Sequence, residues 1–167
     1  MHVSVVDRDR GAKALMKRAS DLKGRVRVGI LADAPKTEAS TEGAGESEEE
    51  PLSLLEVAAI HEFGAPDAGI PMRSFIRATV DQHADEIKRL QAVLAGHVIA
   101  GRMTEDQALN ALGAKVAGWM QARIAAGIEP PLAPETIERK AGGKGGSTPL
   151  INTGQLRSAI TWKVEAG

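Results

Sequence analysis

The sequence has no cysteine and no tyrosine, and its aromatic rings are limited to two phenylalanines and two tryptophans. The absence of cysteine excludes disulfide bonds, thiolate catalysis and sulfur-ligated metal ions. So few aromatic side chains predict an aliphatic core. They also disfavour binding modes in which bases or sugars stack on several protein rings.

Long hydrophobic runs are also missing. No stretch approaches the roughly 18 consecutive apolar residues of a membrane-spanning helix. The first residues, MHVSVVDRDRG, carry charges where a signal peptide would be apolar. We therefore expect a soluble protein that is made in a cytoplasm and has no membrane partner.

The length of 167 residues predicts one domain, 1–167. The net charge of −1 conceals an uneven distribution of charge along the chain. Segment 33–50 holds seven acidic residues and one lysine, which gives it a charge of −6 and leaves +5 for the remainder. Residues 33–51 contain no large apolar side chain, so we expect an acidic disordered loop there. The glycine-rich segment 141–148, AGGKGGST, is expected to be a second flexible loop.

Four segments, 9–22, 53–63, 74–101 and 104–126, have apolar residues at helical spacing between typical helix start and stop signals. Two of them begin with an S/T-x-x-E/Q capping box. The predicted N-caps are Asp9, Ser53, Ser74 or Thr79, and Thr104. We expect the two longest helices to pack as an antiparallel pair.

Alternating segments predict the strands. Residues 25–32 form the clearest strand, 160–166 form a final strand, and 2–6 form a short edge strand. Between the helices, 64–71 contains two prolines and predicts an extended, rigid crossing. Asn152 with Gln155 predicts a further capping box. The expected fold is α+β, with a small antiparallel or mixed sheet of three or more strands packed against two long helices.

Candidate catalytic and metal-binding motifs are incomplete. His61 and Glu62 resemble the start of a zinc-protease motif, but the second histidine would fall at position 65, which is Ala65. In AGGKGGST, Lys144 is not followed directly by serine or threonine, as a phosphate-binding P-loop requires. No G-x-S-x-G nucleophile motif occurs. We predict no enzyme activity, no cofactor and no metal.

Arg73 and Arg77 lie four residues apart around Phe75, at the expected start of the long helix. One interpretation is a solvated helical face. The other is that both guanidinium groups reach acidic or backbone groups of a neighbouring subunit, because the planar arginine fork suits interfaces.

Three motifs occur in order: IHEFGAPDAGIPMRSFIRAT (60–79), PPLAPETIERKAG (130–142) and PLINTGQLRSAITWKV (149–164). Together they resemble the tail-completion and neck proteins of tailed bacteriophages, a group that includes head–tail joining, virion morphogenesis and minor tail components. The resemblance covers residues 54–164, about two-thirds of the chain. Family members more often have proline at the position of Ser74.

The resemblance implies a structural virion protein, in the host cytoplasm during assembly and then in the tail or neck. It implies a homo-oligomeric ring, commonly a hexamer, that contacts other neck, tail-terminator or connector proteins and lies near the channel DNA. It carries no catalytic residues over. With Arg77 added from the arginine pair, the implied interface residues are His61, Glu62, Phe63, Gly64, Ile70, Pro71, Arg73, Phe75, Arg77, Asn152, Thr153, Gly154 and Leu156.

Other functions stay open at this point. A tail terminator or a head-side stopper would have the same sequence features. A DNA-binding accessory protein, which would use the +5 charge outside the acidic segment, is the alternative from a different class.

Overall fold

The computed structural model describes residues 11–31, 53–132, 154–165 and 167. These residues combine helices with an antiparallel sheet, so the predicted α+β class is confirmed. The loops predicted at 33–51 and 141–148 and the strand predicted at 2–6 lie outside the described residues. In chain order the elements are α1 (Ala12–Ser20), β1 (Arg25–Ile30), α2 (Leu54–Phe63), η1 (Pro66–Ala68), α3 (Arg77–Gln82), α4 (Ala84–Ile99), α5 (Glu105–Ala126), α7 (Gln155–Ser158) and β2 (Ile160–Glu165).

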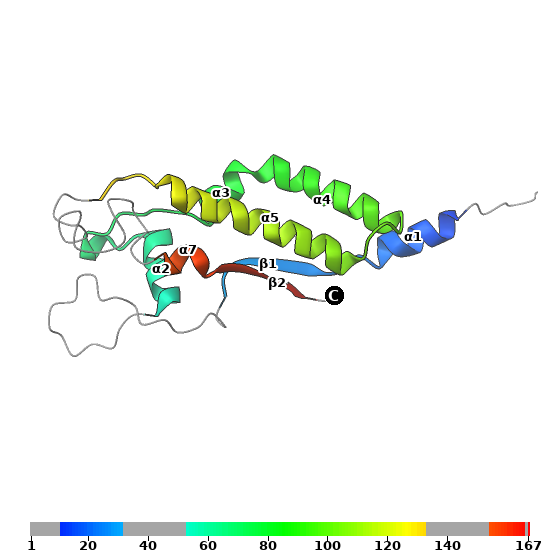
Figure 1. Ribbon diagram of the computed structural model, residues 1–167, viewed down its shortest axis with the longest axis horizontal. Helices are drawn as coiled ribbons and strands as arrows, with labels where there is room; N and C mark the ends of the chain where they lie inside the picture. Colours follow the sequence, from blue (N-terminus) through cyan, green and yellow to red (C-terminus); the bar gives the residue numbers. More distant parts are fainter. Residues whose placement is uncertain (1–10, 32–52, 133–153, 166) are drawn as a thin grey trace, which may run out of the picture.

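Helix α5 lies at the centre of the molecule, with α4 on one side and the β1–β2 sheet on the other (Figure 1). Its predicted capping box is confirmed: Thr104 Oγ1 accepts a hydrogen bond from Gln107 N at 3.1 Å, and Thr104 N donates to Gln107 Oε1 at 2.9 Å. The antiparallel packing predicted for the two longest helices is present between α4 and α5. The buried residues of α5 are Ala108, Leu112, Gly113, Val116, Ala117, Met120 and Ile124.

The sheet packs one face on α5. β1 and β2 pair antiparallel, with Val28 opposite Trp162 and Ile30 opposite Ile160. Val26, Val28 and Ile30 of β1 pack against the core. Within the described ranges the sheet has two strands, where three or more were predicted.

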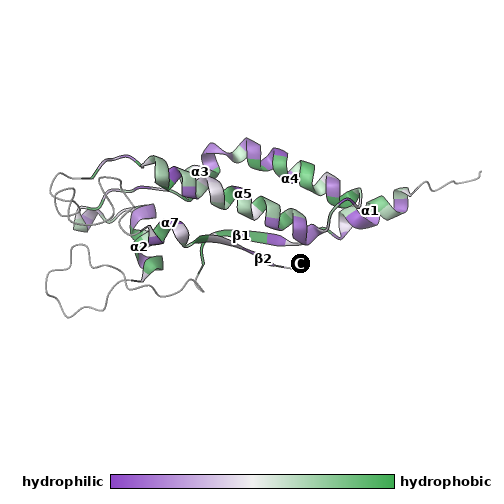
Figure 2. Ribbon diagram, viewed as in Figure 1, coloured by the Kyte–Doolittle hydropathy of each residue, from purple (hydrophilic) through white to green (hydrophobic). Residues whose placement is uncertain are grey.

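A glycine allows the sheet to lie this close to α5. A Cβ atom on Gly113 would come within 2.5 Å of Trp162 Cδ1 and 2.8 Å of Val26 Cγ2, closer than real Cβ contacts. Gly113 therefore permits the close approach of the sheet to α5. Hydrophobic and hydrophilic residues alternate along α4 (Figure 2), as expected for a helix with one packed face.

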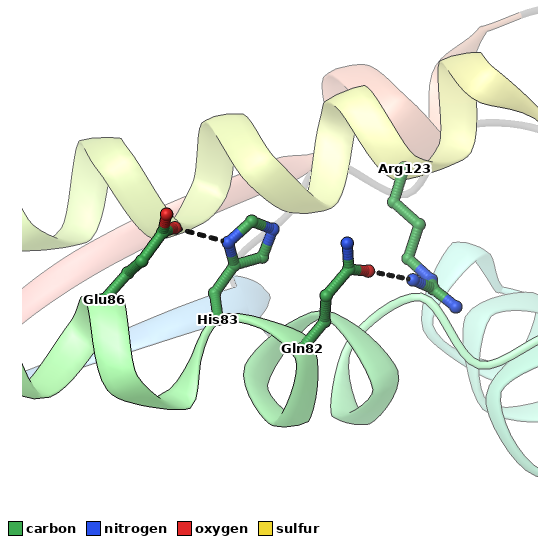
Figure 3. Close-up of polar contacts among 4 residues, drawn as sticks. All are labelled: Gln82, His83, Glu86 and Arg123. Carbon is green, nitrogen blue, oxygen red and sulfur yellow. Dashed lines mark hydrogen bonds and ion pairs between the residues drawn. The ribbon is translucent and has the colours of Figure 1, made fainter.

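The predicted long helix 74–101 is broken at His83, which separates α3 from α4. His83 has φ −104° and ψ 14°. Its ring stacks on Trp119 of α5, with centroids 4.2 Å apart, and its Nδ1 lies 2.7 Å from Glu86 Oε2 (Figure 3). The break thus coincides with one tertiary contact, to Trp119, and one local contact, to Glu86, which the apolar spacing alone could not indicate. The predicted end at Gly101 is confirmed by its left-handed φ of 72°.

Three predicted helix caps are wrong. Helix α3 has Ile76 at its N-cap, with no side-chain cap hydrogen bond, rather than Ser74 or Thr79. Helix α1 begins after Gly11, whose φ of 93° suits glycine, rather than at Asp9. Helix α7 has Gly154 at its N-cap, with φ 76° and no side-chain cap hydrogen bond, in place of the predicted Asn152, which lies outside the described residues. In α1 and α7 a glycine with left-handed backbone geometry stands at the N-cap.

Candidate functional site

The first motif of the sequence begins with α2, which starts as predicted. Ser53 Oγ accepts from Glu56 N at 3.3 Å, and Ser53 N donates to Glu56 Oε2 at 2.7 Å. Ser53 Oγ also donates to Glu56 Oε2 at 2.7 Å. This side-chain bond, followed by the bond from Ser53 N, lowers the pKa of the Glu56 carboxyl. Leu54 and Ala58 face the core. Because α2 is anchored in this way, the positions of His61 and Glu62 in its last turn are fixed.

The segment after α2 is a compact turn, so the predicted extended crossing over 64–71 is wrong. Gly64 has φ 77°, and a Cβ atom there would lie 2.9 Å from Met72 N. Ala65 and Ile70 exchange backbone hydrogen bonds of 2.9 and 3.0 Å across η1. The chain thereby folds back on itself, and Arg73 N donates to His61 O at 2.7 Å.

The buried carboxylate of Glu62, only 5% exposed, binds the start of α3. Its Oε2 accepts from the backbone N–H groups of Phe75 and Ile76, both at 2.9 Å. Its Oε1 accepts from Arg77 N at 2.9 Å and from Ser74 Oγ at 2.6 Å. Helix N-termini present unpaired N–H groups and favour negative charge. Glu62 therefore caps α3 from another helix.

Two opposing effects set the pKa of Glu62. Burial raises the pKa of this carboxyl, and the hydrogen bonds from Ser74, Ile76, Arg77 and Phe75 lower it. The hydrogen bonds outweigh burial, so the pKa lies below its ordinary value. The carboxylate is consequently ionised at neutral pH and acts as a structural anion.

Arg73 is fixed inside its own chain. Its side chain is buried, with 5% of the residue exposed. Nε donates to Pro130 O at 2.8 Å and Nη2 donates to Pro131 O at 3.0 Å. Burial lowers the pKa of this guanidinium. Both sequence interpretations of Arg73, a solvated face and a contact to a neighbouring subunit, are therefore replaced by a tie between the first motif and the start of the second.

Phe75 and its neighbours complete the corner between α2 and α3. Phe75 is fully buried, so the expectation that this ring is displayed on the surface is wrong. Thr79 Oγ1 donates to Phe75 O at 2.6 Å. Ser74 Oγ accepts from Ala78 N at 3.1 Å, and Ser74 O accepts from Arg123 Nε at 3.2 Å. Arg123 Nη1 also donates to Gln82 Oε1 at 2.8 Å (Figure 3).

The remaining residues of the first motif lie at or near the surface. Phe63 is 67% exposed. Pro71 and Arg77 are also exposed, and His61, Gly64 and Ile70 are half-buried. Met72 is 51% exposed and its sulfur lies 3.4 Å from Arg77 Nη2. The corner thus has a polar interior and a partly apolar exterior.

The structure describes only part of the N-T-G-x-L motif, residues 152–156. Asn152 and Thr153 lie outside the described residues. Gly154 begins α7 with its left-handed φ, and Leu156 is 6% exposed in the hydrophobic core. Leu156 is therefore a packing residue that sets the path of the chain into β2.

Metal and membrane chemistry find no support in the part of the chain that the structure describes. No group of three or more histidine, aspartate or glutamate side chains there is placed to hold a metal ion. Among the described helices, none combines the length and apolarity needed to cross a bilayer. Neither a protein-family model, nor a curated protein, nor a solved structure matches the chain.

Proposed function

We propose that this chain is a structural virion protein of a tailed phage, which completes the tail at the neck and joins it to the head connector as a homo-oligomeric ring. The proposal starts from the ordered resemblance of three motifs. The observation that carries it is how the first motif is used. Glu62 and Arg73 form hydrogen bonds with backbone groups of this chain, while Phe63 and Met72 are exposed.

This division suits an assembly protein. Glu62 accepts four hydrogen bonds and Arg73 donates two, and these bonds fix the corner before any partner binds. A preorganised corner loses little conformational entropy on binding. Large apolar side chains on its exterior provide area that is removed from water on association.

The partners that follow are further copies of this chain, in a hexameric ring, together with neck, tail-terminator or connector proteins. The channel DNA would lie nearby without specific contacts. The protein would act in the host cytoplasm during assembly and then reside in the virion. Tail termination and head-side stopping are the nearest alternative roles for the same ring.

Particle assembly in cells that lack this gene tests the proposal. We expect filled heads beside complete, unattached tails, and rescue by the unaltered gene. Tails of uncontrolled length would indicate a terminator, and heads that lose their DNA would indicate a stopper. Normal particles would contradict all three roles.

A DNA-binding accessory protein is the second candidate, and the outer face of the sheet favours it. Arg25 and Arg27 are exposed there, and Lys163 lies directly opposite Arg27. Like charges at paired positions repel each other, and a bound anion would reduce that repulsion. Glu165, 3.3 Å from Arg27, already compensates part of this positive charge. Duplex DNA affinity that falls steeply with salt in the purified chain, and is lost in Arg25→Gln, would support this role.

A further inference from the structure

Helix α1 is amphipathic, yet its apolar face is open. Ala12, Leu15, Met16 and Ala19 recur at spacings of three and four, which places them on one side of the helix. Every residue from 11 to 20 is exposed, and Leu15 and Met16 are 44% and 72% exposed. An amphipathic helix is normally stabilised by packing its apolar face. The face of α1 therefore has the composition of a buried surface, and among the described residues its apolar side chains are left exposed.

Its C-terminal end is fixed to the body of the molecule. Arg18 Nη1 donates to Ile99 O, the last residue of α4, at 3.2 Å. Just after α1, Gly24 N donates to Glu105 Oε1 of α5 at 2.7 Å. Helix α1 thus projects from one end of the molecule in a set direction (Figure 1).

A second open apolar surface lies on α2. Leu55, Ala59 and Phe63 are spaced four residues apart and form one stripe, which we call the α2 stripe. Leu55 is 47% and Phe63 67% exposed, and Ala59 is exposed as well. The adjacent side of α2, about 100° around the helix, carries Leu54 and Ala58 into the core.

The two surfaces carry opposite charges. Helix α1 contains Lys13, Lys17 and Arg18 and no acidic residue. Helix α2 contains Glu56 and Glu62 and no lysine or arginine. Of these carboxylates Glu56 is exposed, as is Asp67 in η1 just beyond α2, while Arg77 near Met72 is the exposed cation of the corner. On α4, the helix that carries the exposed Val93, the acidic Asp85 and Glu86 are exposed beside Lys88 and Arg89, so its charge is mixed. Charge complementarity therefore favours α2 as the partner of α1.

The two surfaces lie at opposite ends of an elongated molecule, α1 at one end and α2 at the other (Figure 1). Helix α1 therefore does not reach the α2 stripe of its own chain. Two unlike, complementary surfaces on one chain are the requirement for head-to-tail association, which closes into a ring when the rotation between subunits permits.

We propose that α1 of one copy docks its apolar face on the α2 stripe of the next copy. Leu15 and Met16 pack against Leu55 and Phe63, and Lys13, which flanks Met16 at the edge of the apolar face, lies toward Glu56. The inference rests on the proposed oligomeric function and specifies its interface. It assigns α1 a role that none of the three sequence motifs includes.

Disulfide trapping tests the contact, because the chain has no cysteine of its own. Met16→Cys and Phe63→Cys each introduce one exposed thiol into the full chain, and one variant carries a mass tag. A disulfide forms only where the two Cβ atoms approach to about 4 Å. On oxidation of the mixed variants we expect the tagged–untagged heterodimer several-fold above either homodimer. Val93→Cys, 56% exposed on α4, mixed with each variant measures random collision.

Other results overturn the inference. Homodimers of either single variant at the level of the heterodimer would indicate a symmetric contact. A heterodimer no stronger than the Val93→Cys background would mean that α1 covers its face in another way, such as on a different protein or on vesicles of anionic lipid. A double variant, Met16→Cys with Phe63→Cys, should give a ladder of linked species that ends in a closed ring, and a product that stays monomeric would contradict the model.

The trapping result separates this inference from the proposed function. Heterodimers together with normal particles in cells lacking the gene would leave the interface standing and remove the neck role. Unattached heads and tails without heterodimers would keep the neck role and remove this interface.

Discussion

The corner between α2 and α3 and the helix α1 differ in whether their side chains find partners within the described part of the chain. In the corner, Glu62 and Arg73 bind backbone groups of their own chain, and Phe75 is fully buried. In α1, the apolar residues that would ordinarily be packed are all exposed. The corner is complete within one subunit, and α1 is not. A substitution in the corner should therefore be felt first in the stability of the monomer, and one in α1 first in its association.

The largest expected effect on stability comes from Glu62→Gln. The amide keeps the size of the side chain but loses the charge and offers an N–H where the α3 terminus needs an acceptor. We expect a loss of about 3 kcal/mol in the free energy of unfolding, since buried N–H groups lose their partner. Urea unfolding measures it. Glu86→Gln, which alters an exposed carboxylate beside His83, is the matched control and should change stability little.

The pH dependence of stability should identify the same group. Because the pKa of Glu62 is lower in the folded chain than in the unfolded one, its contribution is present at neutral pH and is lost as the pH falls through the folded pKa. Unfolding midpoints measured from neutral to acid should fall more steeply for the parent chain than for Glu62→Gln. Parallel curves would show that Glu62 does not carry the charge that holds α3.

A smaller loss is expected for Arg73→Lys. Lysine keeps the charge but does not reproduce the fork that donates to Pro130 O and Pro131 O. We expect a destabilisation of about 2 kcal/mol, as one buried carbonyl loses its donor. Arg77→Lys, at an exposed arginine, is the comparison, and equal effects of the two substitutions would contradict the structural role of Arg73.

The smallest effect on stability should come from Met16→Ser. Its side chain is 72% exposed, so the free energy of unfolding of the isolated subunit should change by no more than about 0.5 kcal/mol. Self-association, followed by light scattering across a concentration series, should weaken markedly. A clear loss of monomer stability would show that α1 packs on its own chain, and unchanged association would remove α1 from the interface.

Local signals in the sequence predicted much of the fold. The capping boxes at Ser53 and Thr104 and the strands β1 and β2 were predicted from neighbours a few residues apart, and all four are confirmed. The cap that Glu62 gives to α3 spans more than ten residues of sequence, so no i, i+3 rule could find it. The ties from Arg73 to 130–131 and from His83 to Trp119 are longer still.

That the segment between α2 and α3 forms an interface stays a prediction, but the burial of its residues was not predictable from their spacing. Sequence spacing does not reveal which side of a turn faces inward, so Phe75 and Arg73 were expected on the surface with Phe63. The exposure of α1 was also missed, because its helical spacing looks the same whether or not a partner lies against it. The interface role of Phe63 and Arg77 stays a prediction.

The central claim is that the corner is rigid within one subunit so that its exterior can assemble. Phe63→Asp tests it most directly, in purified subunits and in cells that produce particles. We predict a urea midpoint close to that of the parent chain, because Phe63 is 67% exposed, together with a loss of joined particles. Normal yields of joined particles from Phe63→Asp would contradict the account.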